Sequence, residues 1–389
     1  MKIVQVTKAY APVVGGVETV VSTLAEGLSR EHSVSVGVLV CRDVRSIRSS
    51  DSAMNGIPVR AAGRWGTLLS VPVSPMLPSM LAQSEGDILH LHEPFPLADL
   101  AIFTRPAIMQ RFKRLVISWH GDIARQAWAM PLYRHLLNRI LEKASRIMAS
   151  SPQLVANSTV LFPFRDRCTV LPYGLDLSWA GATVDRTSRV QEIRRTYGAP
   201  LVLSVGRLVY YKGLRYLVDA MRSVPGAHAV IIGSGPLEGS LREQISTAGL
   251  EQRVHVLPHQ SEEELHAFYM ACDVFVLPSI ARSEAYGLVQ IEAMACGKPV
   301  ISTEINTGTT FVNLDGLTGL TVPPCDAAAL SSALDRLLGD DELRASLGEN
   351  ARARAMKEFT VDHMVRRALD VYRSALAEEA IPGHHRSRR

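Results

Sequence analysis

The sequence lacks the long apolar runs that a membrane-spanning helix needs. No hydrophobic stretch in the 389 residues approaches the roughly 18–20 residues that cross a bilayer. The first ten residues, MKIVQVTKAY, also lack the charged-then-apolar layout of a secretory signal. This opening segment is instead typical of a first β-strand. We therefore expect a cytoplasmic protein whose contact with a membrane, if it has one, is peripheral.

Cysteine is scarce and scattered. The chain has five, an odd number, and none forms a Cys-x-x-Cys pair: Cys41, Cys168, Cys272, Cys296 and Cys325. The cysteines therefore indicate neither a secreted domain held together by disulfides nor a zinc site. The glycines of the chain match neither Gly-x-Gly-x-x-Gly, the pattern of dinucleotide-binding enzymes, nor the Walker loop of proteins that bind nucleoside triphosphates.

Net charge is small but unevenly spread. The formal charge is +4, with 47% hydrophobic and 21% charged residues, an ordinary composition for a globular protein long enough for two domains. Residues 1–176 hold 19 Lys and Arg against 13 Asp and Glu, whereas the remainder holds 23 against 25. The first half, including Arg105 and the run Arg111–Arg114, therefore has the charge to face a membrane surface or a lipid diphosphate, although a chance excess on solvated faces explains it as well. We predict no nucleic-acid partner.

Short apolar strands alternate with helical stretches along the whole chain. The predicted strands are Ile3–Thr7, Val34–Val40, Ile88–His92, Leu115–Trp119, Ile147–Ala149, Thr169–Leu171, Leu201–Val205, Ala229–Ile232, Val254–Leu257, Val274–Leu277 and Pro299–Ser302. The predicted helices include Val17–Arg30, Leu97–Phe112, Pro131–Lys143, Gln153–Leu161, Gly213–Arg222, Pro236–Ala248 and Glu262–Ala271. This alternation predicts an α/β protein with parallel sheets and crossover helices.

The stretch Pro172–Val190 is rich in Gly, Ser and Thr and has no hydrophobic period, so we interpret it as an interdomain connection. We predict an N-terminal domain over residues 1–175 and a C-terminal domain over 191–360. A final amphipathic helix follows over 361–379, and a disordered tail over 380–389. Two such domains would leave a cleft at the carboxyl ends of their strands, where ligands bind in sheets of this kind.

Two glutamates, Glu284 and Glu292, are the most informative feature of the chain. The first follows the apolar strand VFVLPS, and the second lies in an apolar helix that begins near Gly287. The free N–H groups of that helix, at Gly287, Leu288 and Val289, are suited to a phosphate or diphosphate. Glu284 lies before the helix start and Glu292 about 8 Å along the helix, at 1.5 Å rise per residue, so the two carboxylates can accept from hydroxyls on either side of the diphosphate. The alternative is a pair of solvated surface glutamates.

A second loop supplies positive charge. In Gly206-Arg207-Leu208-Val209-Tyr210-Tyr211-Lys212-Gly213, an Arg and a Lys five residues apart follow a predicted strand. Arg207 offers a fork of donors and Lys212 a point charge, so the two are suited to a diphosphate. Gly233-Ser234-Gly235-Pro236 also follows a strand and is expected near the nucleoside, and Val254–Ser261 is expected to offer backbone contacts to the base.

Three further polar segments follow strands in the first half. Gly15-Gly16 lies between the first strand and the first helix, where it can form a plain turn or meet a phosphate or the sugar. His120, in ISWHGD, can be a loop residue bonded to a backbone group or can contact the sugar at the mouth of the cleft. His90, His92 and Glu93 end another strand and can line an acceptor site; we disfavour a metal site because no third partner is spaced to complete it.

Together these segments resemble glycosyltransferase family 4, whose members are retaining enzymes with the two-domain GT-B fold. The resemblance covers nearly the whole chain, from Gly15-Gly16 through LPYGLD, VGRLVYYKG, IIGSGP and the paired-glutamate segment to GLTGLTVPP. It implies two Rossmann-like doubly wound domains, with the C-terminal helix crossing back to the first. It further implies that Arg207 and Lys212 bind the donor diphosphate, together with amides near Gly287–Val289. Of the two glutamates, Glu292 would bind the ribose and Glu284 the sugar. The resemblance also implies that His120 lies beside the reacting sugar. No metal or cofactor is implied.

One loop departs from the family pattern. Where many members carry Gly-Gly-x-x-Glu, this chain has Thr307-Gly308 and Phe311, within Ile305–Gly319. The sequence of this loop resembles that of bacterial mannosyl- and rhamnosyltransferases of O-antigen or other surface polysaccharides. The resemblance implies GDP-mannose or GDP-rhamnose as donor and a lipid-diphosphate-linked glycan as acceptor. Three alternatives stay open: a UDP-sugar transferase of the same fold, a retaining disaccharide phosphorylase, and a nucleotide-sugar binder without turnover.

Overall fold

The computed structural model describes residues 1–13, 15–68, 71–122, 130–181 and 187–378. The predicted tail over 380–389, and residue 379 of the predicted last helix, lie outside these residues. Among the described residues, none of the helices combines the length and hydropathy needed to cross a bilayer.

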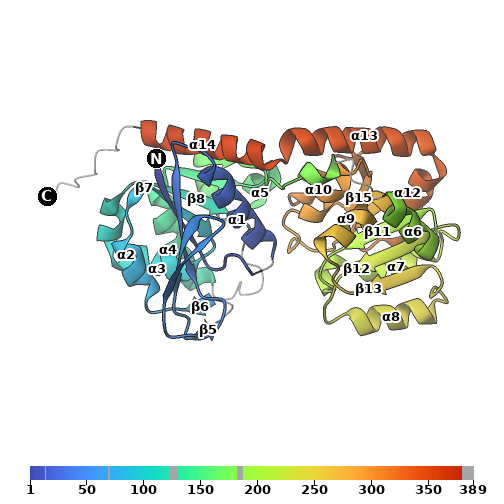
Figure 1. Ribbon diagram of the computed structural model, residues 1–389, viewed down its shortest axis with the longest axis horizontal. Helices are drawn as coiled ribbons and strands as arrows, with labels where there is room; N and C mark the ends of the chain where they lie inside the picture. Colours follow the sequence, from blue (N-terminus) through green and yellow to red (C-terminus); the bar gives the residue numbers. More distant parts are fainter. Residues whose placement is uncertain (14, 69–70, 123–129, 182–186, 379–389) are drawn as a thin grey trace. The chain divides into compact units, whose positions relative to one another are not determined.

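The chain divides into two compact units, each with its own sheet (Figure 1). Unit 1 comprises residues 1–149, 158–171 and the chain from Met364 onward, and unit 2 comprises residues 150–157 and 172–363. Compared with the predicted ranges, the segment 150–157 joins the second unit and the last helix joins the first.

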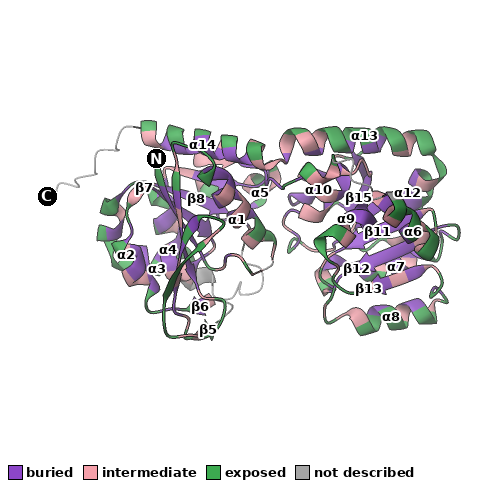
Figure 2. Cartoon of the chain, in the orientation of Figure 1, coloured by how far each residue is buried: buried purple, intermediate pink, exposed green. Residues whose placement is uncertain are grey.

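Unit 1 is built on an eight-stranded sheet of spatial order β10-β9-β8-β7-β1-β2-β4-β3. The strands are β1 (Lys2–Thr7), β2 (Ser35–Cys41), β3 (Ser50–Met54), β4 (Ile57–Ala62), β7 (Gly86–Glu93), β8 (Phe112–Trp119), β9 (Arg146–Ala149) and β10 (Cys168–Val170), with a separate ribbon of β5 (Gly66–Leu68) and β6 (Val71–Val73). All pairs in the large sheet are parallel except β3 with β4. The central strands are buried almost throughout (Figure 2), because helices cover parallel sheets on both faces.

The helices of unit 1 are α1 (Gly16–Ser29), α2 (Leu77–Gln83), α3 (Pro96–Thr104), α4 (Met130–Lys143) and α14 (Val361–Ala377), with 3₁₀ turns η1 (Pro106–Arg111) and η3 (Phe162–Arg167). From Met364 on, α14 belongs to this unit. The hydroxyl of Tyr372 lies 2.9 Å from Nδ1 of His90 on β7, and Nε of Arg114 on β8 donates to the carbonyl of Ala375 over 2.8 Å. The predicted return of the last helix to the first domain is therefore confirmed.

Unit 2 holds a six-stranded, all-parallel sheet of order β13-β12-β11-β14-β15-β16. The strands are β11 (Leu201–Val205), β12 (His228–Ile232), β13 (Val254–Leu257), β14 (Val274–Leu277), β15 (Val300–Thr303) and β16 (Gly319–Val322). This is the order of a Rossmann-type doubly wound sheet, in which the strand order reverses between the first and fourth strands. Here the reversal lies between β11 and β14, and ligands bind at that point in such sheets.

The helices of unit 2 are α5 (Pro152–Asn157), α6 (Thr187–Tyr197), α7 (Leu214–Met221), α8 (Glu238–Thr247), α9 (Glu262–Ala271), α10 (Leu288–Ala295), α11 (Thr309–Val312), α12 (Ala327–Gly339) and α13 (Asp341–Glu358), with 3₁₀ turns η4 (Ser178–Ala180) and η5 (Tyr210–Lys212). Side chains of α7, α8 and α12 pack with the sheet in one apolar cluster, whereas α6, α9 and α10 form a second group. Both units thus have the predicted α/β architecture.

Four local predictions need correction. The predicted helix Leu97–Phe112 is two elements, α3 and η1, divided at Arg105–Pro106, because the residue before a proline avoids the helical region. The predicted helix Gln153–Leu161 ends at Asn157, since Oγ of Ser158 accepts from the N–H of Leu161 and starts a new turn. The predicted connection up to Val190 overlaps α6, which starts at Thr187. The strands between Ser50 and Val73 were not predicted.

Candidate active site

Two loops meet at the point where the strand order of unit 2 reverses. One follows β11 and contains Arg207 and Lys212, and the other follows β14 and contains Glu284. The N–H of Ile280 donates to the carbonyl of Tyr211 over 2.8 Å, which ties the loops together. Gly213 has φ +63°, and a Cβ there would lie 2.0 Å from the carbonyl oxygen of Pro278. Only glycine allows the two loops to approach this closely.

Lys212 and Glu284 form a buried ion pair. Nζ of Lys212 lies 2.6 Å from Oε2 of Glu284, and the two side chains are 11% and 10% exposed. The hydroxyl of Ser279 donates to the same oxygen over 3.1 Å. A cation and a hydroxyl thus both contact one carboxylate oxygen at the carboxyl ends of β11 and β14. In a buried pair of this kind each charge compensates the other, so removing one partner would leave an uncompensated buried charge.

Arg207 lies at the rim of this arrangement rather than inside it. Its side chain is exposed, and Nη2 donates to the hydroxyl of Tyr211 over 3.0 Å. Gly206 (φ +148°) lies under the side chain of Lys212, where a Cβ would be 3.1 Å from Nζ. Gly233 (φ +154°) lies under the same loop, since its Cβ would be 1.9 Å from the carbonyl oxygen of Gly206. The predicted glycines Gly206 and Gly233 therefore allow the loops after β11 and β12 to stack.

Helix α10 begins next to the ion pair. Its N-cap, Gly287, has φ +75° and no side chain caps the first turn. The amide of Gln290 donates to the carbonyls of Tyr286 and Gly287, over 3.2 and 3.4 Å, which fixes the turn into the helix. The uncapped N–H groups around Leu288 and Val289 are therefore oriented by the fold and carry the positive end of the helix dipole.

Glu292 lies in the second turn of α10. Its Oε2 accepts a hydrogen bond from the hydroxyl of Tyr269 on α9 over 2.7 Å. Burial raises the pKa of the Glu292 carboxyl to about 7, and the Tyr269 hydroxyl acts in the opposite direction. Tyr269 is fully buried, and a buried tyrosine hydroxyl needs such a partner.

The loop that departs from the family pattern closes over the Glu284 segment. The hydroxyl of Thr307 donates to the carbonyl of Glu284 over 2.7 Å, and the N–H of Gly308 donates to the carbonyl of Ala285 over 2.8 Å. A Cβ at Gly308 would lie 2.7 Å from that carbonyl oxygen. Phe311 packs with Tyr286 and with the guanidinium of Arg354, 6.5 and 5.2 Å from its ring centre. At the position of the usual glutamate, this chain therefore has an apolar ring that packs against the residue preceding Gly287.

In unit 1, His120 is buried at the carboxyl end of β8. Its Nε2 lies 3.0 Å from Nδ1 of His92, and the two rings stack with centres 5.3 Å apart. Burial lowers the pKa of His120 to about 3, with a smaller contribution from Lys8. His90, beside His92, lies 2.8 Å from the Ser118 hydroxyl, and burial lowers its pKa to about 3. These histidines are therefore neutral hydrogen-bonding groups at physiological pH.

Glu93 forms a buried acidic cluster with Asp99 of α3 and Tyr133 of α4. The hydroxyl of Tyr133 contacts the Asp99 carboxyl and lies 3.5 Å from Oε2 of Glu93. Burial raises the pKa of both carboxyls, and for Asp99 the neighbouring Glu93 adds to the effect. Two carboxyls this close share a proton rather than ionise together. Among the described residues, no group of three His, Cys, Asp or Glu side chains is arranged to hold a metal ion.

Gly15 is the N-cap of α1, and Gly16 is its first residue. Gly15 is extended, with φ −178°. A Cβ there would lie 2.3 Å from a carboxylate oxygen of Glu18, so this acidic side chain lies against the start of the helix. The contact of Gly15-Gly16 with a phosphate or sugar stays a prediction.

Both halves of the chain match models of known families. Residues 14–179 match Glycosyltransferase Family 4, and residues 185–354 match Glycosyl transferases group 1. A curated relative, the O-antigen chain mannosyltransferase C of Escherichia coli, is 33% identical over 98% of this chain and 100% of its own length. The chain therefore belongs to the family of glycosyltransferases that includes this relative. The D-rhamnosyltransferase WbpZ of Pseudomonas aeruginosa is 38% identical over 71% of each protein.

The glycosyltransferase also shares its fold with solved structures. The Anabaena protein HepE, solved in complex with UDP, superposes with a TM-score of 0.78 over 96% of this chain and 100% of that one, at 22% identity. This likeness concerns the fold alone and confirms the predicted GT-B architecture.

The structure brings together, within unit 2, the predicted residues Lys212 and Glu284, with Gly206 beneath them. The sequence did not indicate that Ser279, Thr307 and Tyr269 hold the two glutamate segments of the glycosyltransferase. A signal for Tyr269 exists, because a tyrosine in an otherwise apolar stretch needs a partner for its hydroxyl. The sequence does not indicate that this partner is Glu292, 23 residues away.

Proposed function

We propose that this glycosyltransferase moves a hexose of the mannose or rhamnose type from a GDP-sugar to a lipid-linked glycan, with retention at the anomeric carbon. The observation that carries the proposal is the meeting of Lys212, Glu284 and the start of α10 at the reversal point of unit 2. The two relatives named as a mannosyltransferase and a rhamnosyltransferase support the choice of sugar. The sequence of the Ile305–Gly319 loop supports GDP as the nucleotide.

In this proposal the donor diphosphate binds at the uncapped start of α10. The N–H groups near Gly287, Leu288 and Val289 face its oxygens, and Lys212 and Arg207 supply positive charge. Glu284 accepts from a hydroxyl of the sugar and Glu292 from hydroxyls of the ribose. The loop after β12, which Gly233 allows to stack on the loop after β11, lies near the nucleoside in this proposal.

The difficult step is departure of the diphosphate from an oxocarbenium-like carbon. Negative charge grows on the leaving oxygen, and Lys212 is held in place by its bond to Glu284 before the reaction begins. Charges that need no rearrangement during the reaction stabilise the transition state most effectively. The cations and the helix start supply the positive charge, so the proposal includes no metal ion or cofactor.

We propose retention by attack of the acceptor hydroxyl on the face from which the diphosphate leaves. The leaving phosphate accepts the proton of that hydroxyl. The contacts of Glu284 support this route over a covalent one: its Oε2 is already bound by Lys212 and Ser279. A carboxylate neutralised by an ammonium at 2.6 Å is a poor nucleophile. His120, neutral and hydrogen-bonded to His92, is suited to contact a sugar hydroxyl.

Thermal unfolding with a panel of nucleotides tests the donor. A ligand that binds the native state raises its stability by about 2.7 kcal/mol at a hundredfold excess over Kd. We expect GDP and GDP-mannose or GDP-rhamnose to raise the Tm, and UDP or ADP conjugates to have little effect. A rise with UDP-sugars instead would leave the fold and mechanism intact but contradict the choice of base. Transfer from the binding donor to a lipid-linked acceptor then separates a transferase from a binder without turnover.

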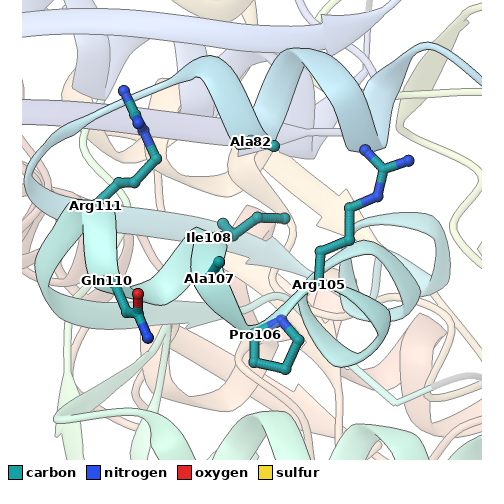
Figure 3. Close-up of a pocket in the computed structure, with 7 residues that line it drawn as sticks. All are labelled: Ala82, Arg105, Pro106, Ala107, Ile108, Gln110 and Arg111. Carbon is teal, nitrogen blue, oxygen red and sulfur yellow. The ribbon is translucent and has the colours of Figure 1, made fainter.

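We also propose that unit 1 contacts an anionic membrane through α3 and η1. Leu100 and Phe103 of α3 are 49% and 48% exposed. The turn η1 that follows α3 lines a hollow of about 540 Å³, in which Arg105 and Arg111 flank Ala107 and Ile108 (Figure 3). Exposed apolar side chains on one element, followed in the chain by cations on the next, suit a surface of anionic lipids.

The predicted basic run contributes less to this surface than its sequence suggests. Lys113 pairs with Asp87 at 2.7 Å, and Arg114 donates to the carbonyl of Ala375 in α14. Phe112 is buried. Arg111 pairs with Glu85 at 3.1 Å, so Arg105, which donates to Ser79, keeps the most available charge.

Replacing Leu100 and Phe103 together by glutamate should weaken binding to vesicles that contain anionic lipid by tenfold or more, since burying each side chain is worth about 1.5–3 kcal/mol. Co-sedimentation at rising salt measures the effect, and salt should weaken the wild-type contact because it is partly electrostatic. Leu317→Glu is the matched control, because Leu317 is equally exposed, at 49%, but lies in unit 2. Equal loss in the control, or binding that salt does not affect, would contradict the proposal.

A further inference from the structure

The hydroxyl of Tyr269 and the carboxylate of Glu292 make a direct contact between α9 and α10. The hydrogen bond is 2.7 Å long and uses Oε2 of the carboxylate. The tyrosine is fully buried, and its ring packs against Phe275 of β14 with centres 5.8 Å apart. The glutamate is only half-buried. Oε2 therefore has a protein partner, and the residue keeps some exposed surface at which a ligand can approach.

The charged and titratable groups around Glu292 are few. On α9, besides Tyr269, Glu262 acts on the carboxylate and disfavours its ionised form. Cys296 at the end of α10 also faces the Glu292 carboxylate, and the thiol of Cys272 lies on the α9 side. Lys298, after α10, and Arg352, on α13, act on Cys296 rather than on Glu292. Among these groups, the Tyr269 hydroxyl favours the ionised carboxylate, because a hydrogen bond donated to a carboxylate stabilises its charge.

We infer that Tyr269 is a positioning residue for donor binding, whose hydroxyl keeps the Glu292 carboxylate ionised and turned so that it accepts the vicinal hydroxyls of the donor ribose. This inference rests on the proposed function of Glu292. An ionised carboxylate accepts on both oxygens, and so it accepts from Tyr269 and from the ribose at the same time. A protonated carboxyl presents a donor where the ribose also presents donors. Donor binding therefore requires the ionised form.

A dependence of donor affinity on pH follows. The burial of Glu292 places its pKa at about 7, so the carboxyl gains a proton as the pH falls below that value. Affinity for the donor should be full at pH 8–9 and fall as the pH drops through about 7. Tyr269→Phe keeps the ring but removes the hydroxyl, so the midpoint should move upward. Loss of a hydrogen bond to the charged carboxylate corresponds to an upward shift of this midpoint by about one pH unit or more. The Kd of the Tyr269→Phe variant at pH 7 should therefore be about fivefold higher than that of the wild type.

The experiment measures the Kd of GDP-mannose by calorimetry between pH 5.5 and 9. This ligand is chosen because its diphosphate, esterified at both ends, does not titrate in that range. The proteins are the wild type, Tyr269→Phe, Glu262→Gln and Glu292→Gln. Glu262→Gln removes a neighbouring negative charge, so its midpoint should move downward, opposite to that of Tyr269→Phe. Glu292→Gln should bind about tenfold more weakly at pH 8 and show a flat profile. Equal far-ultraviolet spectra and Tm values within a few degrees exclude loss of folding as the cause.

Two outcomes separate this inference from the proposed function. If Glu292→Gln is weak and flat but Tyr269→Phe follows the wild-type curve, Glu292 binds the ribose without help from Tyr269, and the inference is wrong. If Glu292→Gln binds as the wild type does, the ribose assignment itself is wrong, and the inference falls with it. The ribose is common to GDP- and UDP-sugars, so a preference for a UDP-sugar contradicts only the choice of base, and the series is then run with that sugar nucleotide.

Discussion

Lys212→Met is expected to reduce kcat by about 10²–10³-fold, as loss of one preorganised charge donor does in other enzymes, and also to destabilise the fold. Methionine fills the volume of the lysine without its charge. The Glu284 carboxylate, with a side chain only 10% exposed, then lacks its cation. Removing one partner of a buried ion pair costs about 3–5 kcal/mol. Steady-state kinetics and denaturant unfolding measure the two effects separately.

Two further variants control this prediction. Arg207→Ala should lower kcat by a similar factor but leave the free energy of unfolding almost unchanged, because Arg207 is exposed and bonded only to Tyr211 among the contacts described above. Adding Glu284→Gln to Lys212→Met should restore most of the stability but none of the activity. Near-normal turnover in either single variant would contradict the assignment of that residue to the diphosphate. Unchanged stability in Lys212→Met would mean that the ion pair contributes nothing to the fold.

Gly213→Ala should be among the most damaging substitutions of its size in the chain. Its φ of +63° already disfavours a side chain, and the new Cβ would lie 2.0 Å from the carbonyl oxygen of Pro278. Either the β11 loop or the β14 loop must then move, which separates Lys212 from Glu284. We expect a loss of about 3 kcal/mol or more in the free energy of unfolding, the range of severe backbone effects, together with loss of donor binding.

Gly239→Ala is the matched control for Gly213→Ala. Gly239 lies on the exposed side of α8, and a Cβ there has nothing within 4 Å. Alanine in a helix is more stable than glycine by about 0.5–1 kcal/mol. The control should therefore be neutral or slightly stabilising, with normal donor binding. Equal effects of the two substitutions would contradict the geometric argument at Gly213.

The sequence predicted the parts of this fold that have strong local signals. The strands of unit 2 are short runs of β-branched and other apolar residues, and β11, β13 and β14 begin and end where they were predicted. Buried parallel strands give such continuous apolar runs. In contrast, β3 has the sequence SDSAM and is exposed almost throughout. It pairs only at the sheet edge, with β4, so its sequence carries no hydrophobic pattern that could have revealed it.

The same distinction applies to the site. The charged residues Arg207, Lys212, Glu284 and Glu292 were predicted from their place after strands or in the helix that follows. What the sequence did not indicate is how the side chains pair. Lys212 and Glu284 are 72 positions apart, and their contact depends on β11 and β14 being neighbours in the sheet. That neighbour relation is a property of the topology, and local patterns do not encode it.

The course of α14 has a consequence for the order in which the protein matures during synthesis. Tyr372 and Ala375 of this helix complete the packing of β7 and β8, which are made more than 250 residues earlier. Domains generally fold in the order in which they leave the ribosome. Here the earlier-made unit waits for the latest helix, whereas the later-made unit already has all its strands. The part of the β7–β8 surface that α14 covers therefore stays uncovered until the chain beyond Met364 has been made.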